Sequence, residues 1–159
     1  LHGARVFVTA GTDEKVARGI KNGAEAGVNY LRKDWVPVAK QWAGRSGFDI
    51  IVDHVGADTL PKGLWLLARG GRIVTCGVTS GAEMQLNLAP VFFKTLSVLG
   101  STMGGLGDQK QVADLVFSGS LKPIVDSRYS LDEVASAHRR MNEREAFGKI
   151  LLQVDPELS

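Results

Sequence analysis

Residues that could bind a phosphate group lie just after the first strand that the sequence predicts. Gly11 and Thr12 end this strand, and Lys15 follows one helical turn further along. A hydroxyl and a cation beside a small residue suit an anionic phosphate, because each charge-assisted hydrogen bond contributes about 1.5–3 kcal/mol. The alternative is structural, with Thr12 as a helix N-cap and Lys15 as a solvated helix residue. Asp13 and Glu14 are close enough to weaken the attraction for an anion.

Glycines end three further runs of apolar and β-branched residues. The runs cover residues 48–56, 72–77 and 95–100, and the short apolar core of each indicates a buried strand. A helix predicted at 57–69 joins the first two runs as a right-handed crossover of a parallel sheet. Sheets of this kind bind ligands at the carboxyl ends of their strands, where glycine lets the backbone approach closely. Ordinary turn glycines are the alternative.

The elements that position these residues alternate along the whole chain. Further strands are predicted at 4–10, 26–30, 124–129 and 148–154, and helices at 12–22, 34–43, 108–117 and 131–141, with a short helix within 87–94. The helix starts are assigned to Thr12, Asp34 and Ser130, the last with Glu133 in a capping box. The pattern predicts an α/β fold with a doubly wound parallel sheet.

Charge and composition exclude several classes of function. Nineteen Lys and Arg against seventeen Asp and Glu leave a net charge of +2 without a basic run, which argues against nucleic-acid or membrane-surface binding. No apolar stretch approaches the roughly 18 residues of a membrane span. The single cysteine rules out an internal disulfide and favours a reducing, cytoplasmic setting. We expect Cys76 to be a small buried strand residue, with a reactive thiol as the alternative.

The three histidines do not form a catalytic or metal-binding pattern. His54 follows a strand as a loop residue, and His138 shares a helical stripe with apolar side chains, so we expect it to pack in the core. His2 lies at the start of the sequence. The acidic pairs at 13–14 and 132–133 are explained as helix-start charges. No catalytic residue and no metal ligand is therefore assigned.

Six segments together resemble the coenzyme-binding part of the medium-chain dehydrogenase/reductase superfamily, in its quinone oxidoreductase and zinc-type alcohol dehydrogenase branches. In the family's order they are residues 8–15, 28–30, 48–56, 70–77, 99–101 and 148–152. The resemblance implies a Rossmann-type dinucleotide-binding domain over residues 1–118. It implies for residues 119–159 a strand-helix-strand that returns toward the family's catalytic domain.

The resemblance also implies that the sheet is truncated. The family's first strand and its Gly-rich turn for the pyrophosphate are missing, residues 1–3 look like the tail of the next helix, and the catalytic domain with any zinc ligands is absent. The missing strand would lie between those at 4–10 and 50–53, so two edges are expected in mid-sheet. We expect the chain to close this gap by rearrangement or by pairing with another copy.

The resemblance places cofactor contacts at the strand ends. It implies that the 2′-phosphate and adenosine of NADP are held by Gly11, Thr12, Lys15 and Tyr30. It implies further contacts at Val55, Gly56, Cys76, Gly77, Val78, Thr79, Leu99, Gly100 and Ser101. Lys149 matches a position where the family often places a basic or polar group, although a surface lysine on an edge strand is the alternative. The expected cofactor is NADP(H) in preference to NAD(H), and the presence of zinc is left open.

These observations predict the cofactor-binding part of an NADP(H)-preferring oxidoreductase, inactive in isolation. The parent enzyme would transfer hydride to or from a quinone, enone, aldehyde or alcohol. We expect a homodimer or higher oligomer. One alternative function is a non-enzymatic nucleotide-binding or dimerisation module, because the strand at 95–100 resembles the family's edge strand for subunit pairing. Another is an unrelated doubly wound fold, such as a methyltransferase that binds an S-adenosyl compound.

Overall fold

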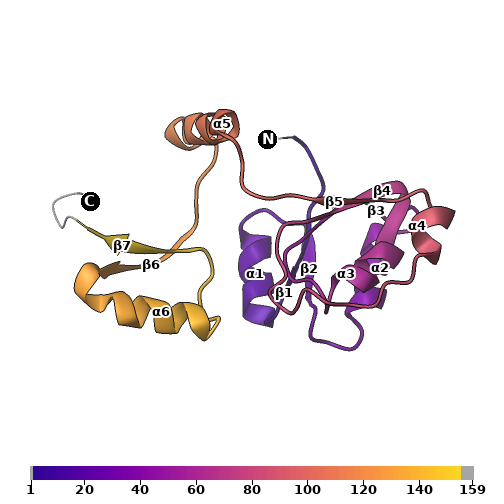
Figure 1. Cartoon of the computed structure of the whole chain (residues 1–159), viewed down its shortest axis with the longest axis horizontal. Coiled ribbons are helices and arrows are strands. Elements are labelled where there is room, and N and C mark those ends of the chain that lie inside the picture. Colours follow the sequence, from indigo (N-terminus) through magenta and orange to yellow (C-terminus); the bar gives the residue numbers. More distant parts are fainter. Residues whose placement is uncertain (1, 155–159) are drawn as a thin grey trace. The chain divides into compact units, whose positions relative to one another are not determined.

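The computed structural model describes residues 2–154. These residues form two compact units, one from His2 to Met103 and one that begins at Gly104 (Figure 1). The predicted boundary between residues 118 and 119 stays a prediction about domain organisation.

The first unit alternates strands and helices as the sequence predicts. Its elements are β1 (Phe7–Ala10), α1 (Asp13–Lys21), β2 (Ala26–Asn29), α2 (Trp35–Ala43), β3 (Phe48–Asp53), α3 (Leu60–Leu66), β4 (Leu67–Thr75), α4 (Ala89–Phe93) and β5 (Ser97–Gly100). β1 pairs with β2, and β4 lies between β3 and β5, with parallel strands in every pair. The predicted α/β fold with parallel strands is confirmed.

The sheet is interrupted between β1 and β3. Among the residues that the structure describes, β1 and β3 belong to separate sheets and share no ladder of hydrogen bonds. Aromatic rings connect them instead, since the ring centroid of Phe7 lies 5.2 Å from that of Trp42 and 5.8 Å from that of Phe48. The chain therefore does not close the expected gap by pairing these two strands, and pairing with another copy stays a prediction.

One face of the three-stranded sheet is well packed, and the other is open within this unit. Leu64 and Leu67 are 1% exposed and Ile73 is fully buried. Burial of a side chain of this size contributes about 1.5–3 kcal/mol. On β3, Ile50 and Val52 are 57% and 67% exposed, because they point to the opposite face from Ile51, which packs against the core.

The helix predicted at 57–69 is shorter than expected. α3 ends at Leu66, and β4 begins directly at Leu67, whose backbone is extended. The ammonium group of Lys94 donates hydrogen bonds of 2.8 Å to the carbonyl groups of Trp65 and Leu67 at this junction. Burial, followed by the nearby charge of Lys40, lowers the pKa of Lys94. A residue far along the chain thus stabilises the end of α3.

The helix starts agree only in part with the predictions. Thr12 caps α1, because its side-chain oxygen accepts a hydrogen bond from the backbone N–H of Lys15 at 3.2 Å. Asp34 occupies the N-cap position of α2 without a side-chain capping bond. Residues 2–6 are not helical, contrary to the expected helix tail, since Gly3 adopts a φ of 66° that interrupts a helix. Leu1 lies outside the described residues.

The second unit contains a long helix and a small parallel pair of strands. Its elements are α5 (Leu106–Phe117), β6 (Val125–Ser130), the 3-10 helix η1 (Leu131–Glu133), α6 (Val134–Asn142) and β7 (Lys149–Gln153). The predicted capping box is present, because the Glu133 carboxylate accepts hydrogen bonds from the backbone N–H and the hydroxyl of Ser130. Both bonds lower the pKa of Glu133.

The expectation that His138 packs in the core is wrong. His138 is exposed, whereas its neighbour Ala137 is 6% exposed and faces the strands. α6 covers only a two-stranded sheet, so the stripe that can be buried is narrow. The apolar neighbours Val134 and Met141 on the predicted stripe are also exposed, at 38% and 56%.

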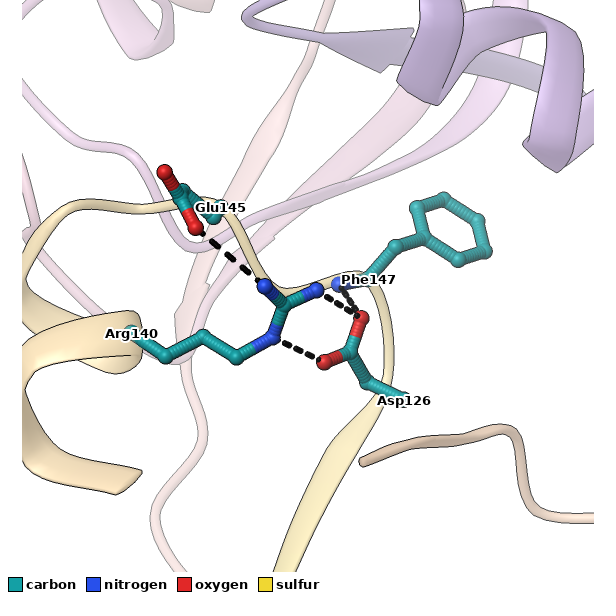
Figure 2. Close-up of polar contacts among 4 residues, drawn as sticks. All are labelled: Asp126, Arg140, Glu145 and Phe147. Atoms are coloured by element: carbon teal, nitrogen blue, oxygen red, sulfur yellow. Dashed lines mark hydrogen bonds and ion pairs between the residues drawn. The ribbon is translucent and has the colours of Figure 1, made fainter. Parts of the chain in front are cut away.

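A buried carboxylate holds the second unit together (Figure 2). Asp126, at the start of β6, accepts hydrogen bonds from Arg140 Nε at 2.6 Å and from Arg140 Nη2 at 3.2 Å. It also accepts one from the backbone N–H of Phe147 at 2.9 Å. The Asp126 side chain is 1% exposed, and Arg140 further contacts Glu145. The bonds from Arg140, and then that from Phe147, hold the pKa of Asp126 well below its usual range.

We expect acid to loosen this unit. A carboxyl group with a depressed folded-state pKa stabilises the fold above its ordinary value of 3.8, and this stabilisation is lost as the pH falls below that value. Hydrogen–deuterium exchange at the Phe147 amide should show a protection factor that decreases from about pH 4 downward. Asp126→Asn should lower the protection factor and remove its pH dependence. The same pH dependence in both proteins would contradict this assignment.

Candidate functional site

The predicted phosphate-binding residues meet where β1 and β2 end. The backbone N–H of Tyr30 donates to the carbonyl of Ala10 at 3.0 Å, so Tyr30 extends the pairing beyond β2. A Cβ atom on Gly11 would lie 3.3 Å from the Tyr30 hydroxyl oxygen. The small size of Gly11 thus leaves room for the hydroxyl at the end of β1. The structure brings Gly11, Thr12, Lys15 and Tyr30 together around the start of α1.

Thr12 has a structural role at the start of α1. Its hydroxyl oxygen accepts the capping hydrogen bond, so the structural interpretation of this residue is confirmed. A hydroxyl group that accepts one hydrogen bond can still donate its own hydrogen to a ligand. The N-terminus of α1 adds a partial positive charge that favours anions. Both features suit a phosphate at this position.

Arg32 is a site residue that the sequence interpretation missed. It follows β2, and its Nη2 atom lies 2.5 Å from a carboxylate oxygen of Asp13 at the start of α1. Both side chains are more than half exposed. The sequence could have indicated Arg32 as a cation two residues after Tyr30. Its partner Asp13, however, lies 19 positions away along the chain. The cations of Lys15 and Arg32 and the carboxylate of Asp13 thus all lie near the start of α1 and the end of β2.

A second group of predicted residues lies at the ends of β3 and β4, where two loops are bonded to each other. The backbone N–H and the hydroxyl of Ser80 both donate to the carbonyl of Val55 at 2.7 Å. The backbone N–H and the hydroxyl of Thr79 donate to the carbonyl of His54 at 3.3 Å and 3.1 Å. These bonds fix Val55 and Gly56 relative to Val78 and Thr79.

Asp53, which the sequence interpretation did not select, organises the same loops. Its side chain is buried and accepts hydrogen bonds from the backbone N–H of Val55 at 3.1 Å and of Gly56 at 2.8 Å. It also accepts one from the Thr59 hydroxyl next to α3. An Asp at a strand end that precedes a turn glycine is the signal that could have identified it.

The expectation that Cys76 is a buried strand residue is wrong. β4 ends at Thr75, and the Cys76 side chain is exposed. The backbone N–H of Cys76 donates to the carbonyl of Asp53 at 3.0 Å, and its Sγ atom lies 3.7 Å from the same oxygen. Cys76 therefore belongs to the exposed loop that follows β4.

The glycines at the strand ends differ in backbone conformation and in the space around the Cβ position. Gly56 has a φ of 92°, and a Cβ atom there would lie 2.6 Å from the carbonyl oxygen of Gly81. A Cβ atom on Gly77 would lie 3.1 Å from the carbonyl oxygen of His54, which is a less severe contact. Gly100, at the end of β5, has open space within 4 Å of the Cβ position. Close approach of a ligand is thus possible at Gly100, whereas packing and turn geometry explain Gly56.

The remaining predicted residues lie next to these loops or in the second unit. Leu99 is 44% exposed, and the backbone N–H of Ser101 donates to the carbonyl of Thr75 at 2.9 Å, which continues the sheet. Lys149 begins β7, is exposed, and donates its backbone N–H to the carbonyl of Ile124 at 2.8 Å. Its role toward a cofactor stays a prediction.

Residues 2–154 lack two further features that a functional site could use. His, Cys, Asp and Glu side chains in this range do not gather in groups of three or more that could hold a metal ion. No helix in the same range combines the length and the apolar character needed to span a lipid bilayer.

Comparison with known proteins relates this geometry to one family. The model of the family described as zinc-binding dehydrogenase matches residues 1–118. The quinone oxidoreductase of Homo sapiens is 30% identical over 158 residues, which cover 95% of this chain and 47% of the human protein. The chain thus spans about half the length of the curated relatives that it matches.

Solved structures agree with the family match. A crystal structure of an NAD-dependent alcohol dehydrogenase superposes with a TM-score of 0.89 at 40% identity, covering 96% of this chain and 45% of that one. A crotonyl-CoA carboxylase/reductase in complex with NADP gives a TM-score of 0.86, covering 96% and 44%. Its 18% identity supports similarity of the fold alone.

Two alanine substitutions should separate the roles of the strand-end glycines. Gly56→Ala places a side chain at positive φ against the Gly81 carbonyl, so we expect a loss of about 2–4 kcal/mol in the free energy of unfolding. Gly100→Ala is the matched control, and we expect a change within about 0.5 kcal/mol because its Cβ enters open space. Urea unfolding measures both. Equal losses would show that the two positions are packed alike.

Proposed function

The chain belongs to the zinc-binding dehydrogenase family, and from this membership we propose that it is the cofactor-binding part of an NADP(H)-preferring oxidoreductase. Its relatives include a quinone oxidoreductase and an alcohol dehydrogenase, so the proposed substrate of the complete enzyme is a quinone, enone, aldehyde or alcohol. The observation that carries the NADP preference is the site at the ends of β1 and β2. There, Gly11 replaces the acidic residue that would accept hydrogen bonds from an unphosphorylated ribose and repel a 2′-phosphate.

The residues present fit the phosphorylated end of the cofactor. We assign the 2′-phosphate and the adenosine to the Thr12 and Tyr30 hydroxyl groups, the backbone at Gly11, and the positive charge of Lys15. Charged donors and hydroxyl groups beside a helix N-terminus are the usual partners of a phosphate. NADP(H) supplies the hydride chemistry when it is bound, and these residues bind and orient it.

The loops at the ends of β3, β4 and β5 would hold the rest of the cofactor. Hydrogen bonds between the loops keep their backbones in place, which favours a site formed in advance of binding. The proposed contacts are Val55, Gly56, Cys76, Gly77, Val78, Thr79, Leu99, Gly100 and Ser101, with Lys149 as a further contact. The open space at Gly100 supports close approach of a ligand there. Within this scheme, residues 1–118 provide the dinucleotide side, and the chain alone does not turn over substrate.

Replacement of Lys15 tests the proposed function. In Lys15→Ala we expect the dissociation constant for NADPH to rise roughly tenfold or more, and that for NADH to change little, because one charged donor to the phosphate is lost. NADPH and NADH fluorescence titrations measure both constants. Lys21→Ala, at the other end of α1, removes the same charge away from the site and is the control. Equal effects of Lys15→Ala on the two cofactors would contradict the assignment.

A specific observation also favours the second candidate function, dimerisation. All four residues of β5 are exposed, and the ladder on one side of β5 pairs it with β4. The opposite edge therefore presents backbone donors and acceptors to another strand. We infer that two copies pair through β5 in a two-fold symmetric contact.

A charge on β5 tests this pairing. In Val98→Lys we expect sedimentation velocity to show a shift from dimer toward monomer, since an edge lysine opposes strand pairing. Val98 is 46% exposed, so the fold should tolerate the change. Met103→Lys introduces the same charge at a side chain that is 94% exposed, and should leave the dimer intact. A wild-type chain that is monomeric at all concentrations would refute the inference.

A further inference from the structure

We propose that the ion pair between Asp13 and Arg32 sets the choice between the phosphorylated and the unphosphorylated dinucleotide. Arg32 is the specificity-determining cation for the 2′-phosphate, and Asp13 is the carboxylate that competes with the phosphate for it. This inference rests on the proposed function, because it concerns the same end of the same site. It adds two residues that the sequence interpretation did not assign to the cofactor.

The fold places both residues at the phosphate-binding end of β1 and β2. Asp13 is the first residue of α1, directly after Thr12, and Arg32 follows Tyr30 by two positions. β1 and β2 are parallel, with Ala10 opposite Asn29, so their ends lie side by side (Figure 1). Arg32 reaches across from the end of β2 to α1 and donates to the Asp13 carboxylate. The guanidinium group thus lies beside the residues proposed for the phosphate.

The ion pair can exchange its carboxylate for a phosphate at low cost. The side chains of Arg32 and Asp13 are 57% and 62% exposed, and exposed pairs of this kind are weakly stabilising. A 2′-phosphate carries more negative charge than a carboxylate, and its oxygens match the planar donors of a guanidinium group. Arg32 should therefore leave Asp13 when a 2′-phosphate binds.

Asp13 acts in the opposite sense on the unphosphorylated cofactor. A carboxylate near the ribose can accept hydrogen bonds from the diol, and it repels a phosphate. Because the pair contains both groups, this chain has a partner for each form of the ribose. The balance between them sets the preference, and removal of either group should shift it in a defined direction.

The test uses two adenosine nucleotides that occupy only this end of the cofactor. Calorimetric titration of the chain with adenosine 2′,5′-bisphosphate and with adenosine 5′-monophosphate gives the two dissociation constants. We expect Asp13→Asn to bind the bisphosphate about fivefold more tightly, since Arg32 is released and a repulsion is removed. We expect Arg32→Gln to bind it about tenfold more weakly. Neither variant should bind the monophosphate more tightly.

Two further variants separate a pairwise effect from a general effect of charge. Glu14→Gln removes the same charge from the same turn of α1, whereas the ion pair of Arg32 is with Asp13, so its gain should be clearly smaller. In the double variant Asp13→Asn with Arg32→Gln, the gain should largely disappear. Equal gains in Asp13→Asn and Glu14→Gln, or a full gain without Arg32, would overturn the inference.

Failure of this inference is distinguishable from failure of the proposed function. If the unsubstituted chain binds the bisphosphate and Asp13→Asn binds it no more tightly, the competition by Asp13 is refuted while the phosphate site stands. If neither the unsubstituted chain nor Asp13→Asn binds either nucleotide, the proposed function and the inference fail together. Circular dichroism of each variant identifies any loss of fold, and the conservative Arg32→Lys variant then tests the cation with little change in size.

Discussion

The hydrogen bonds of the buried Asp53 side chain fix the loops at the ends of β3 and β4. A buried polar group needs hydrogen-bond partners, and here two backbone N–H groups and the Thr59 hydroxyl supply them. These bonds fix the turn after β3. The loop after β4 then bonds to the carbonyl groups of that turn through Thr79 and Ser80. The backbone at the proposed cofactor site is thus held by a single buried group and the bonds that follow from it.

At the ends of β1 and β2, by contrast, the charged side chains of Arg32 and Asp13 are exposed, and exposed ion pairs of this kind are weakly stabilising. A rigid framework at β3 and β4 combined with adjustable charges at β1 and β2 suits a dinucleotide, whose common parts need fixed contacts and whose ribose varies by one phosphate. One similar solved structure is named as an NAD-dependent enzyme, and another protein with the same fold was solved with NADP, in agreement with a fold that accommodates both.

The remaining structure shows how a chain with a divided sheet is held together. Phe7, Trp42 and Phe48 pack at the starts of β1 and β3, so aromatic contacts connect two sheets that backbone hydrogen bonds do not connect in the described range. The second unit has a buried carboxylate of its own, Asp126, which joins β6 to α6 through Arg140. In both units a buried acidic side chain at the end or start of a strand fixes the adjacent loop.

The sequence alone determined what depends on neighbouring residues. The alternation of apolar runs predicted the parallel strands, and local hydrogen bonding predicted the Thr12 cap and the Ser130–Glu133 box. Only the tertiary structure decided the end of α3, where Lys94 bonds the last carbonyl groups, and the pairing of Arg32 with Asp13. It also decided the exposure of Cys76 and His138, which depends on whether another element covers them. These features depend on contacts between residues that are far apart in the chain. The local sequence pattern does not indicate which distant side chain makes such a contact.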